Sequence, residues 1–399
     1  MIKLPEYVQN CIELLEKSGF SAYAVGGAVR DSLIGVCPND WDVTTSARPE
    51  ETLEVFKDFR TIPTGIKHGT VSVLFDTGGA LLPIEVTTFR VDGDYLDSRH
   101  PASVSFSRDV RDDLSRRDFT VNAMAYSERE GVIDAFGGSD DLKNRIIRTV
   151  GDAEQRFSED ALRILRAFRF AAQLGFEIEE KTLDGAKNTA HLLKNIARER
   201  ISAELKKLLA SRGVVYALEK MVECGVWGAI FDAPEPQDAL IKSLARLSDG
   251  SFELRMAVIL NEIGAEQGIL ESLRLSNSGK RLITRLCGVR DFEICGNIGR
   301  SARHFLQLYS NILPLAIEAL RFYNGNADSL LAAVLEESEK KLPLTVAQLA
   351  LKGGDILPLA GGDHRRVGEI LKLLLERVID DPSFNEREKL IEIAKKSLE

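Results

Sequence analysis

The sequence predicts an α+β fold, in which a small mixed-sheet domain is followed by a long all-α region. Before about residue 140, short β-rich runs (Ala22–Val25, Val71–Phe75 and Leu81–Thr88) are separated by Gly, Pro and Asp clusters. From Ser158 onward, apolar residues recur at spacings of three and four, as helices require, and strand signals almost vanish. With 399 residues, 44% of them hydrophobic, the chain has room for about two to four globular domains.

Composition narrows the class of protein. The N-terminus lacks the charged segment and apolar stretch of a signal peptide, and no apolar run approaches membrane-spanning length. We therefore expect a cytoplasmic protein that does not contact membranes. The five cysteines include no Cys-x-x-Cys pair, so neither a disulfide framework nor a zinc site is expected. A net charge of −9 argues against a surface covered in basic patches, allows a local basic groove, and leaves the oligomeric state open.

A glycine pair, Gly26 and Gly27, forms a turn between the first predicted strand and a helix predicted at Ala28–Ile34. Free N–H groups at a helix N-terminus attract anions, and glycine lets an anion approach the backbone closely. Arg30 adds a forked donor for phosphate. The dinucleotide-binding and Walker glycine patterns are absent from the sequence, so those two classes lose support. For the glycines alone, a turn without a ligand remains the alternative.

Two acidic residues one position apart, Asp40 and Asp42, follow this turn in Asn-Asp-Trp-Asp-Val. On a strand, their carboxylates would share one face while Trp41 points to the other. Such a pair can hold Mg²⁺, which takes oxygen ligands and leaves further positions to water and substrate phosphates. Two ions about 3.5–4 Å apart would clamp the attacking and leaving oxygens of a phosphoryl displacement. The pair therefore indicates nucleotidyl transfer, although an isolated pair can also be solvated loop charge.

Glu85 is the charged residue within the apolar run Leu81–Val86, on the opposite strand face from Ile84 and Val86. A third metal ligand, or a base for the attacking hydroxyl, would suit this position. The competing explanation is an edge-strand charge that discourages aggregation, and the neighbouring Pro83 favours an edge. Both explanations remain open from the sequence.

The segment 116–122, Arg-Arg-Asp-Phe-Thr-Val-Asn, places basic and polar residues at the mouth of an apolar stretch. The arginine pair, which includes Arg117, can hold phosphates there, and Asp118 can hold a ribose hydroxyl. Asn122 is a further candidate for nucleotide binding. A ribose 2′-hydroxyl is what distinguishes a ribonucleotide from a deoxyribonucleotide. The alternative is a helix N-terminus that Asp118 caps.

In the segment 158–170, Asp160 is followed by three arginines at intervals of three. On a helix, Asp160 and Arg163 would be surface neighbours. An acceptor beside a forked donor matches the amino donor and ring-nitrogen acceptor of cytosine and adenine, and it should reject uracil and guanine. Arg166 and Arg169 would rotate away from Asp160 around such a helix and face phosphates. The alternatives are a helix ion pair for Asp160 with Arg163, and intrahelical salt bridges for the other two arginines.

Taken in order, these motifs resemble the head and neck of class II tRNA nucleotidyltransferases. The similarity rests on the glycine turn with Arg30, Asp40 and Asp42, the segment 116–123, Asp134-Ala-Phe-Gly-Gly, Glu159-Asp160 with Arg163, and Arg198-Glu-Arg-Ile-Ser-Ala-Glu-Leu. The resemblance implies a polymerase-β-like nucleotidyltransferase sheet domain followed by an elongated helical neck, body and tail. We place the catalytic head at 1–142, the base-recognition neck at 143–210, the body at 211–300 and a tRNA-binding tail at 301–399.

The resemblance also implies a role for each matching residue. Asp40 and Asp42 would hold the magnesium ions, and Asp160 with Arg163 would select CTP and then ATP. Further nucleotide contacts would come from Gly27, Arg30, Arg117, Arg166 and Arg169. The 3′-hydroxyl of a tRNA acceptor end would attack the α-phosphorus, and pyrophosphate would leave.

The expected product is a complete CCA end added without a template. Members of the family that add only the two cytidines have a shortened loop before the Arg-Arg-Asp motif, whereas residues 91–113 form a full loop here. Addition of the terminal adenosine alone is the second expectation. From other classes, a small-molecule nucleotidyltransferase would explain the aspartates without the helical tail. A non-catalytic RNA-binding module would need neither aspartate.

Overall fold

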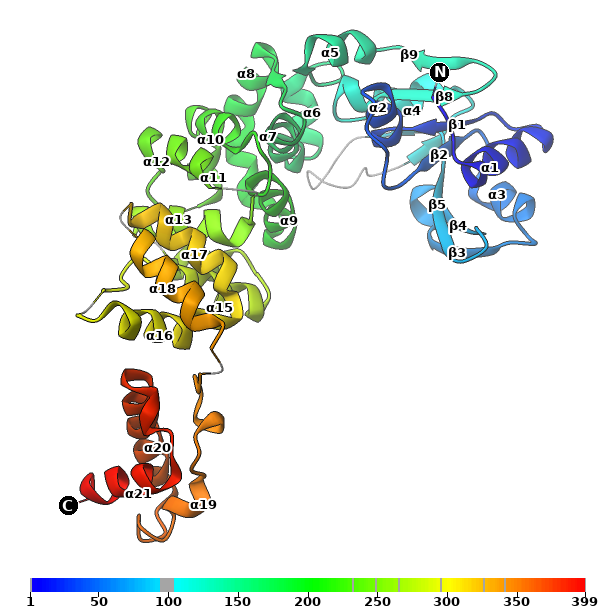
Figure 1. Cartoon of the computed structure of the whole chain (residues 1–399). Coiled ribbons are helices and arrows are strands. Elements are labelled where there is room, and N and C mark those ends of the chain that lie inside the picture. Colours follow the sequence, from blue (N-terminus) through cyan, green and yellow to red (C-terminus); the bar gives the residue numbers. More distant parts are fainter. Residues whose placement is uncertain are drawn as a thin grey trace. The chain divides into compact units, whose positions relative to one another are not determined.

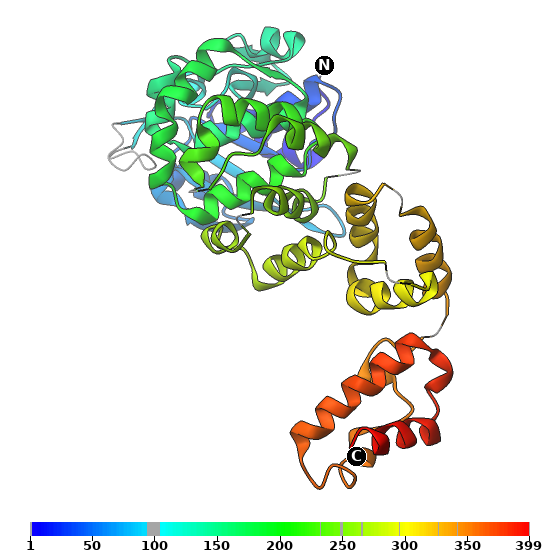
Figure 2. The same ribbon diagram turned by 90° about the vertical axis from the view of Figure 1, so that its left-hand side faces the viewer.

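Figures 1 and 2 show the computed structural model, which describes residues 2–398 except 94–103, 232, 248–249, 265, 295, 326 and 341. The described chain forms two compact units. Unit 1 comprises Met1–Ala245 with Gln267–Arg274, and unit 2 comprises Arg246–Glu266 with Leu275–Glu399. The finer division into head, neck, body and tail stays a prediction.

Unit 1 begins with a mixed sheet that has, in the described residues, seven strands in the order β3-β4-β5-β2-β1-β8-β9. Among these described neighbours, β2 and β5 run parallel and the other pairs are antiparallel. The strands are β1 (Ala22–Val25), β2 (Asp42–Thr45), β3 (Arg60–Gly65), β4 (Thr70–Asp76), β5 (Leu81–Thr88), β8 (Met124–Ser127) and β9 (Gly131–Asp134). The predicted mixed sheet and its three predicted strands are therefore confirmed.

The two faces of this sheet differ in polarity. The β4 side chains of Val71, Val73 and Phe75 are buried, and the Phe75 ring contacts that of Phe56 at the end of α3 (Pro49–Val55) with centroids 6.1 Å apart. Helix α1 (Glu6–Lys17) packs beside α3 and against β1 and β2. Alternate residues, such as Ser72, point to the opposite face, which α4 (Val110–Ser115) partly covers. The polar face is the one that carries the candidate site.

Helices make up most of the rest of unit 1. The helix predicted after the glycine turn is confirmed as α2 (Gly27–Leu33). The later helices are α5 (Gly138–Asn144), α6 (Ala153–Glu159), α7 (Leu162–Leu174), α8 (Glu180–Thr189), α9 (Arg198–Leu209), α10 (Val214–Glu223), α11 (Val226–Ile230) and α12 (Asp238–Ser243). Two short strand pairs supplement them, β6 (Arg90–Asp92) with β7 (Val104–Phe106), and β10 (Ile146–Ile147) with β11 (Glu177–Ile178).

Unit 2 is helical throughout its described residues, as predicted. Its helices are α13 (Phe252–Ile263), α15 (Asn277–Cys287), α16 (Ile298–Tyr309), α17 (Leu313–Tyr323), α18 (Asp328–Ser338), α19 (Gly353–Ile356), α20 (His364–Asp380) and α21 (Arg387–Lys396), while α14 (Glu266–Ser272) spans the boundary between the units. Short 3₁₀ segments of the two units lie at η1 (Ile66–His68), η2 (Thr120–Asn122), η3 (Ala190–Asn195), η4 (Leu244–Arg246), η5 (Ser310–Ile312), η6 (Val346–Gln348) and η7 (Pro382–Phe384). The apolar stripe of α20 is buried in a core that it shares with α19 and α21.

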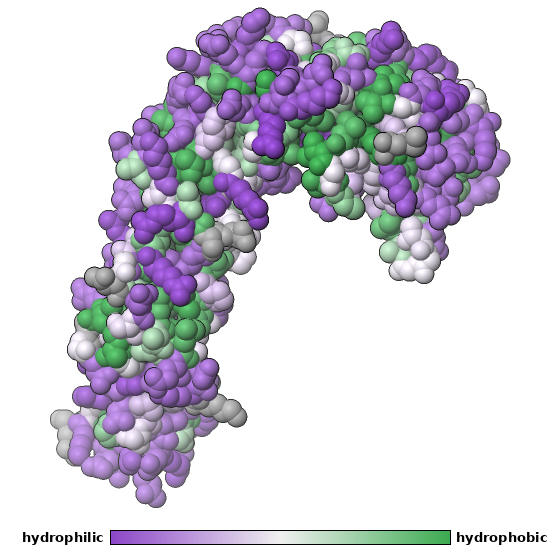
Figure 3. Space-filling model, turned by 45° about the horizontal axis from the view of Figure 1, so that its top comes forward, coloured by the Kyte–Doolittle hydropathy of each residue, from purple (hydrophilic) through white to green (hydrophobic). Residues whose placement is uncertain are grey.

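The face of the molecule drawn in Figure 3 is predominantly polar. Figure 3 shows hydrophilic residues over most of the visible face, with small apolar patches between them. Within the described residues, no helix has both the length and the apolarity that crossing a membrane would require.

Candidate active site

The register of the sheet brings the predicted carboxylates together. Asp42 is the first residue of β2 and pairs with Glu85 of β5, and Glu85 pairs in turn with Ser72 of β4. Directly paired residues of neighbouring strands point to the same face, so Asp42 and Glu85 stand side by side. Asp40 precedes the strand, and its side chain is exposed like that of Asp42, while the intervening Trp41 is buried. The predicted alternation is confirmed, although the strand itself begins only at Asp42.

The edge-strand explanation for Glu85 is wrong. Its strand lies inside the sheet, between β4 and β2. Pro83 fits there because β2 pairs with β5 only from Glu85 onward, so Pro83 has a strand neighbour on the β4 side, where it faces Leu74. Glu85 therefore places an exposed charge on the polar face of an interior strand, where protection against edge pairing has no purpose.

The carboxylate of Asp42 is desolvated and lies among other negative charges. Although its side chain reaches solvent, surrounding protein desolvates the carboxylate and raises its pKa to about 6, with further contributions from the negative charges of Glu85 and Asp40. Arg117 opposes the shift. Protonation would reduce the negative charge at this site, and a bound cation would reduce it in the same way.

The residues present suit a metal that shares its coordination sphere with substrate. Within the described part of the chain, no cluster of three or more His, Cys, Asp or Glu side chains is arranged to hold a metal ion alone. Mg²⁺ commonly takes one or two carboxylates and completes its shell with water and substrate phosphates. Asp40 and Asp42 match that pattern.

The glycine turn lies beside this carboxylate row. Val25, the last residue of β1, pairs with Asp42, and Gly26 follows it with a positive φ of 75°. A Cβ atom at Gly26 would lie 3.0 Å from Nη1 of Arg117, so the absence of a side chain admits that guanidinium. The Nε atom of Arg117 is buried and has no hydrogen-bond partner among the described residues. A buried donor of this kind is satisfied by an acceptor supplied from outside, such as a phosphate oxygen.

Arg30 and Asn122 meet behind the turn. Nη1 of Arg30 donates to Oδ1 of Asn122 over 2.6 Å, and its Nη2 lies 2.7 Å from the Asp31 carboxylate. The guanidinium also lies over the Phe170 ring, 5.2 Å from its centroid. The structure therefore brings Arg30 and Asn122 together from segments that are 92 residues apart.

Asp118 does not cap a helix, so that alternative is wrong. Its Oδ1 accepts the N–H of Phe119 at 2.9 Å and the amide of Asn122 at 3.2 Å, and its Oδ2 accepts Nε and Nη2 of Arg166 at 2.7 and 2.6 Å. Burial alone would raise the pKa of Asp118, but Arg166, Asn122 and the nearby Arg163 lower it to about 2. Asp118 is therefore a permanent anion that fixes Arg166.

The predicted continuous helix across 158–170 is wrong, because the chain breaks at Asp160. Helix α6 ends at Glu159 and α7 begins at Leu162, while Asp160 itself is extended and accepts the Leu162 N–H at 3.1 Å. Aspartate favours such capping positions over helix interiors, since its short side chain bonds nearby backbone N–H groups. The three-residue helical spacing that we predicted from Asp160 to Arg163 therefore does not apply.

The predicted ion pair between Asp160 and Arg163 is also wrong. Both oxygens of Asp160 accept from Arg200 of α9, at 2.8 and 3.2 Å. Arg163 instead donates to Glu159 at 2.6 Å and to the carbonyl oxygen of Arg116 at 3.1 Å. Each member of the predicted base-reading pair is thus held by a separate partner.

Arg166 and Arg169 form ion pairs with other elements, so the predicted intrahelical salt bridges are wrong. Arg166 pairs with Asp118, and Nε of Arg169 lies 2.5 Å from Glu204 of α9. The guanidinium carbons of both arginines lie over the Phe170 ring, 5.3 and 3.8 Å from its centroid. Phe170, Glu204 and Arg200 were not singled out from the sequence, and a buried aromatic between arginines at helical spacing was the available signal for Phe170.

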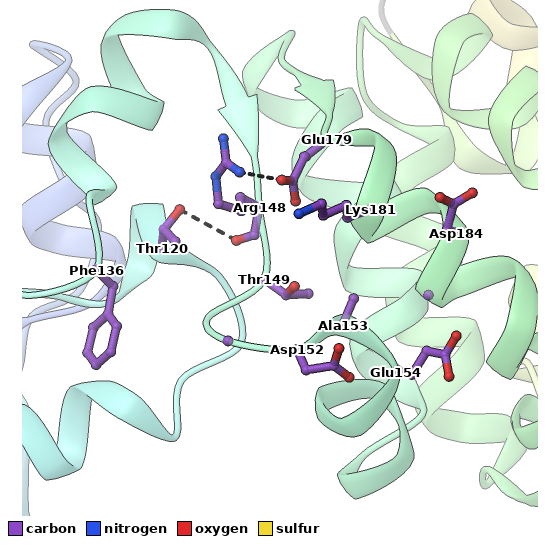
Figure 4. A pocket seen from close by; sticks show the side chains of 12 residues that line it. Thr120, Phe136, Arg148, Thr149, Asp152, Ala153, Glu154, Glu179, Lys181 and Asp184 are labelled. Carbon is purple, nitrogen blue, oxygen red and sulfur yellow. Dashed lines mark hydrogen bonds and ion pairs between the residues drawn. The ribbon is translucent and has the colours of Figure 1, made fainter.

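Figure 4 shows a separate cavity of about 610 Å³ whose described lining contains none of the predicted site residues. Arg148 donates to Glu179 at its rim, and Lys181 and Asp184 lie nearby on α8. Four acids and two bases line this cavity, so its charge does not suit a triphosphate. We place the active site at the carboxylate row instead.

A mixed sheet that presents paired carboxylates beside a glycine turn and a partly buried arginine is the arrangement expected of a nucleotidyltransferase. Residues 22–148 match the family model for the Poly A polymerase head domain, and residues 175–240 match the model described as "Probable RNA and SrmB-binding site of polymerase A".

Full-length relatives define the family more closely. The chain is 35% identical to a CCA-adding enzyme of Ligilactobacillus salivarius, with 99% of this chain and 98% of the relative aligned. It is 37% identical to a CCA-adding enzyme of Anoxybacillus flavithermus, with 96% and 95% covered. A crystal structure of the Bacillus stearothermophilus CCA-adding enzyme in complex with CTP matches with a TM-score of 0.80 and 31% identity, covering 99% and 98% of the two chains. The chain belongs to the family of CCA-adding enzymes.

Proposed function

We propose that this protein adds CCA to the 3′ end of tRNA without a nucleic-acid template, using CTP and ATP and releasing pyrophosphate. The observation that carries the proposal is the row of Asp42 and Glu85 on one sheet face, next to the Gly26 turn and Arg117. These groups suit a nucleoside triphosphate that shares metal ions with the protein. Support also comes from the similarity to a CCA-adding enzyme solved with CTP.

The metal we propose is Mg²⁺, as a pair of ions held by Asp40 and Asp42. When bound, the metal would neutralise charge on the α-phosphate and favour the ionised form of the attacking 3′-hydroxyl. Glu85, beside Asp42, would accept the proton of that hydroxyl or add a third carboxylate to the site. Arg117 would hold the triphosphate through its unpartnered Nε, with Arg30 and the backbone at Gly27 as further contacts.

Base selection is proposed for Asp160 and Arg163. Asp160 would accept the exocyclic amino group of cytosine or adenine, and Arg163 would donate to the neighbouring ring nitrogen. Arg200 occupies both oxygens of Asp160, but each carboxylate oxygen has two lone pairs and can accept a second donor. Uracil and guanine would present like groups to this pair, so both bases would be rejected.

The remaining parts follow the family pattern. We propose residues 1–142 as the catalytic head, 143–210 as the neck, 211–300 as the body and 301–399 as a tail that binds tRNA. A cytoplasmic location is proposed because the substrates are tRNA and nucleoside triphosphates. The full loop expected at 91–113 favours adenosine addition. Residues 94–103 of it lie outside the described residues, and parts of the remainder belong to β6, β7 and α4 instead of a loop.

The test compares three tRNA acceptors, which lack all three terminal nucleotides, lack the last two, or lack only the adenosine. With Mg²⁺ and labelled nucleotides, we expect CTP and ATP to complete all three acceptors, and UTP and GTP to be excluded. Extension of the last acceptor alone would indicate an A-adding enzyme. Labelling of a small aminoglycoside-like acceptor, with no tRNA extended, would indicate a small-molecule nucleotidyltransferase.

A variant pair tests the site within this assay. Asp42→Ala should abolish incorporation and leave tRNA binding unchanged. Asp140→Ala is the matched control, because Asp140 is an exposed aspartate of unit 1 whose described ion pair is with Lys143 on the surface. Full incorporation by Asp42→Ala would overturn the assignment of this carboxylate. Binding of tRNA without any incorporation by the unaltered protein would indicate an RNA-binding module and overturn the proposal.

A further inference from the structure

Asp113, in α4, is a fully buried carboxylate that carries no role in the catalytic scheme above. Nε and Nη2 of Arg116 donate to its Oδ1 at 3.0 and 2.5 Å, and Nη2 of Arg117 donates to its Oδ2 at 3.3 Å. The hydroxyl of Thr44, on β2, donates to the same Oδ2 at 3.2 Å. Burying a charge is costly unless it is paired, and here two guanidinium groups and a hydroxyl pair it.

Through Arg117, the Asp113 network reaches the proposed triphosphate site. Arg117, which Asp113 holds, lies against Gly26 and acts electrostatically on Asp42. The arginine side chain is long and flexible, so the position of its guanidinium beside the glycine turn depends on the groups that bond to that guanidinium. Among the described hydrogen bonds and ion pairs of Arg117, the carboxylate of Asp113 is the side-chain partner.

Through Arg116, the same network reaches Arg163, one of the two residues proposed to select the base. Asp113 holds the side chain of Arg116, whose carbonyl oxygen accepts Nη2 of Arg163 from a position 47 residues away. Glu159 accepts the other terminal nitrogen of Arg163 at 2.6 Å. The direction of the Arg163 fork is therefore set partly by the backbone at Arg116.

We propose that Asp113 is a positioning residue that sets Arg117 for the triphosphate and, through Arg116, Arg163 for the base. This inference rests on the proposed function and names a residue that acts through others rather than on substrate. It predicts that loss of the Asp113 charge changes two properties, the affinity for the nucleotide and the selection of the base. If Asp113 served stability alone, its replacement would change neither property in the protein that remains folded.

The experiment replaces Asp113 with asparagine, which keeps the shape of the side chain and removes its charge. For Asp113→Asn we expect KM for both CTP and ATP to rise about tenfold. The reason is that Arg117, which donates to the triphosphate, loses the charge-assisted hydrogen bond that positions it. The preference for CTP over UTP should fall severalfold. Calorimetry should show the same weakening of CTP binding without tRNA, so the result does not depend on turnover.

A double-mutant cycle separates positioning from general damage. In an Arg117→Ala background, Asp113→Asn should raise KM no further, because the group it positions is gone. An additional tenfold rise in that background would overturn the proposal. Glu337→Gln is the matched control, since Glu337 of unit 2 is also a buried carboxylate with two cationic partners, Arg303 and Lys340. Because Glu337 lies in the proposed tRNA-binding tail, this comparison uses calorimetry without tRNA, in which Glu337→Gln should leave the affinity for CTP unchanged.

A second variant keeps the inference testable if Asp113→Asn does not fold. Arg116 is 19% exposed, and Arg116→Lys retains its charge while losing the fork to Asp113. The folded variant should discriminate CTP from UTP less well, and unchanged discrimination would overturn the proposal. If the unaltered protein adds no nucleotide, the proposed function fails, whereas CTP calorimetry with Asp113→Asn still tests the role of Asp113.

Discussion

Lowering the pH should weaken metal binding at Asp42 well above the range in which ordinary carboxylates take up protons. Desolvation and the charges of Glu85 and Asp40 raise the pKa of Asp42 to about 6, so the protonated form becomes populated as the pH falls through that value. A metal ligand must be ionised, so protons and metal compete for the same oxygen atoms. The raised pKa therefore predicts weaker metal binding at acidic pH.

The size of the effect follows from simple competition. For a single group of pKa about 6, the apparent dissociation constant of the metal rises about 1.1-fold at pH 7, about twofold at pH 6 and about elevenfold at pH 5. An aspartate with an ordinary pKa of about 3.9 would give less than about a 1.1-fold change over the same range.

The assay is a titration of the protein alone with Mn²⁺, followed by electron paramagnetic resonance at each pH. Omitting nucleotide removes the titration of the triphosphate itself, which would otherwise alter metal binding over the same range. Asp42→Asn should bind the ion more weakly and lose the step near pH 6. An affinity for Mn²⁺ that is the same at pH 5 and pH 7 would refute the reasoning.

Three further predictions concern single positions. Gly26→Ala should raise KM for CTP and cost about 1–3 kcal/mol of stability, because its φ is positive and the new Cβ would displace Arg117; unchanged thermal unfolding and KM would contradict this. Arg200→Lys should lower the ratio of kcat/KM for CTP over UTP about tenfold, because lysine cannot replace the forked pair to Asp160; an unchanged ratio would exclude that role. Leu374→Ala should destabilise the core of α20 by about 2–5 kcal/mol in denaturant unfolding and weaken tRNA binding more than CTP binding, whereas equal losses in both would argue against a tRNA-binding tail.

Local periodicity predicted the elements of the fold well. The run Leu81–Thr88 is a strand with the predicted bounds, and the helical spacing of apolar residues predicted from Ser158 onward is seen in α20, whose apolar residues are buried. Periodicity failed at Asp160, where a side chain that bonds the backbone two residues on ended one helix before another began. It could not decide between the two explanations left open for Glu85, because whether a strand is interior depends on partners that are distant in sequence.

Some residues of the candidate site could be predicted from the sequence, and others could not. Motif spacing found Asp42, Gly26 and Arg117, whose chemistry can be recognised from residue type alone. It missed Asp113 and Arg200, which belong to the site only through side-chain contacts with residues of other segments. An arginine on a helix facing solvent and one holding a carboxylate 40 residues away look identical in a single sequence.

The parallel pairing of β2 with β5 has a consequence for how this protein folds. Helix α3 and strands β3 and β4 lie between Asp42 and Glu85 in the sequence, so the contact between these two residues closes a long loop. Contacts of that kind form slowly, and this one also brings like charges together. Refolding from denaturant should therefore pass through a phase in which the helices have formed but the metal does not yet bind. Divalent ions would accelerate only the last step.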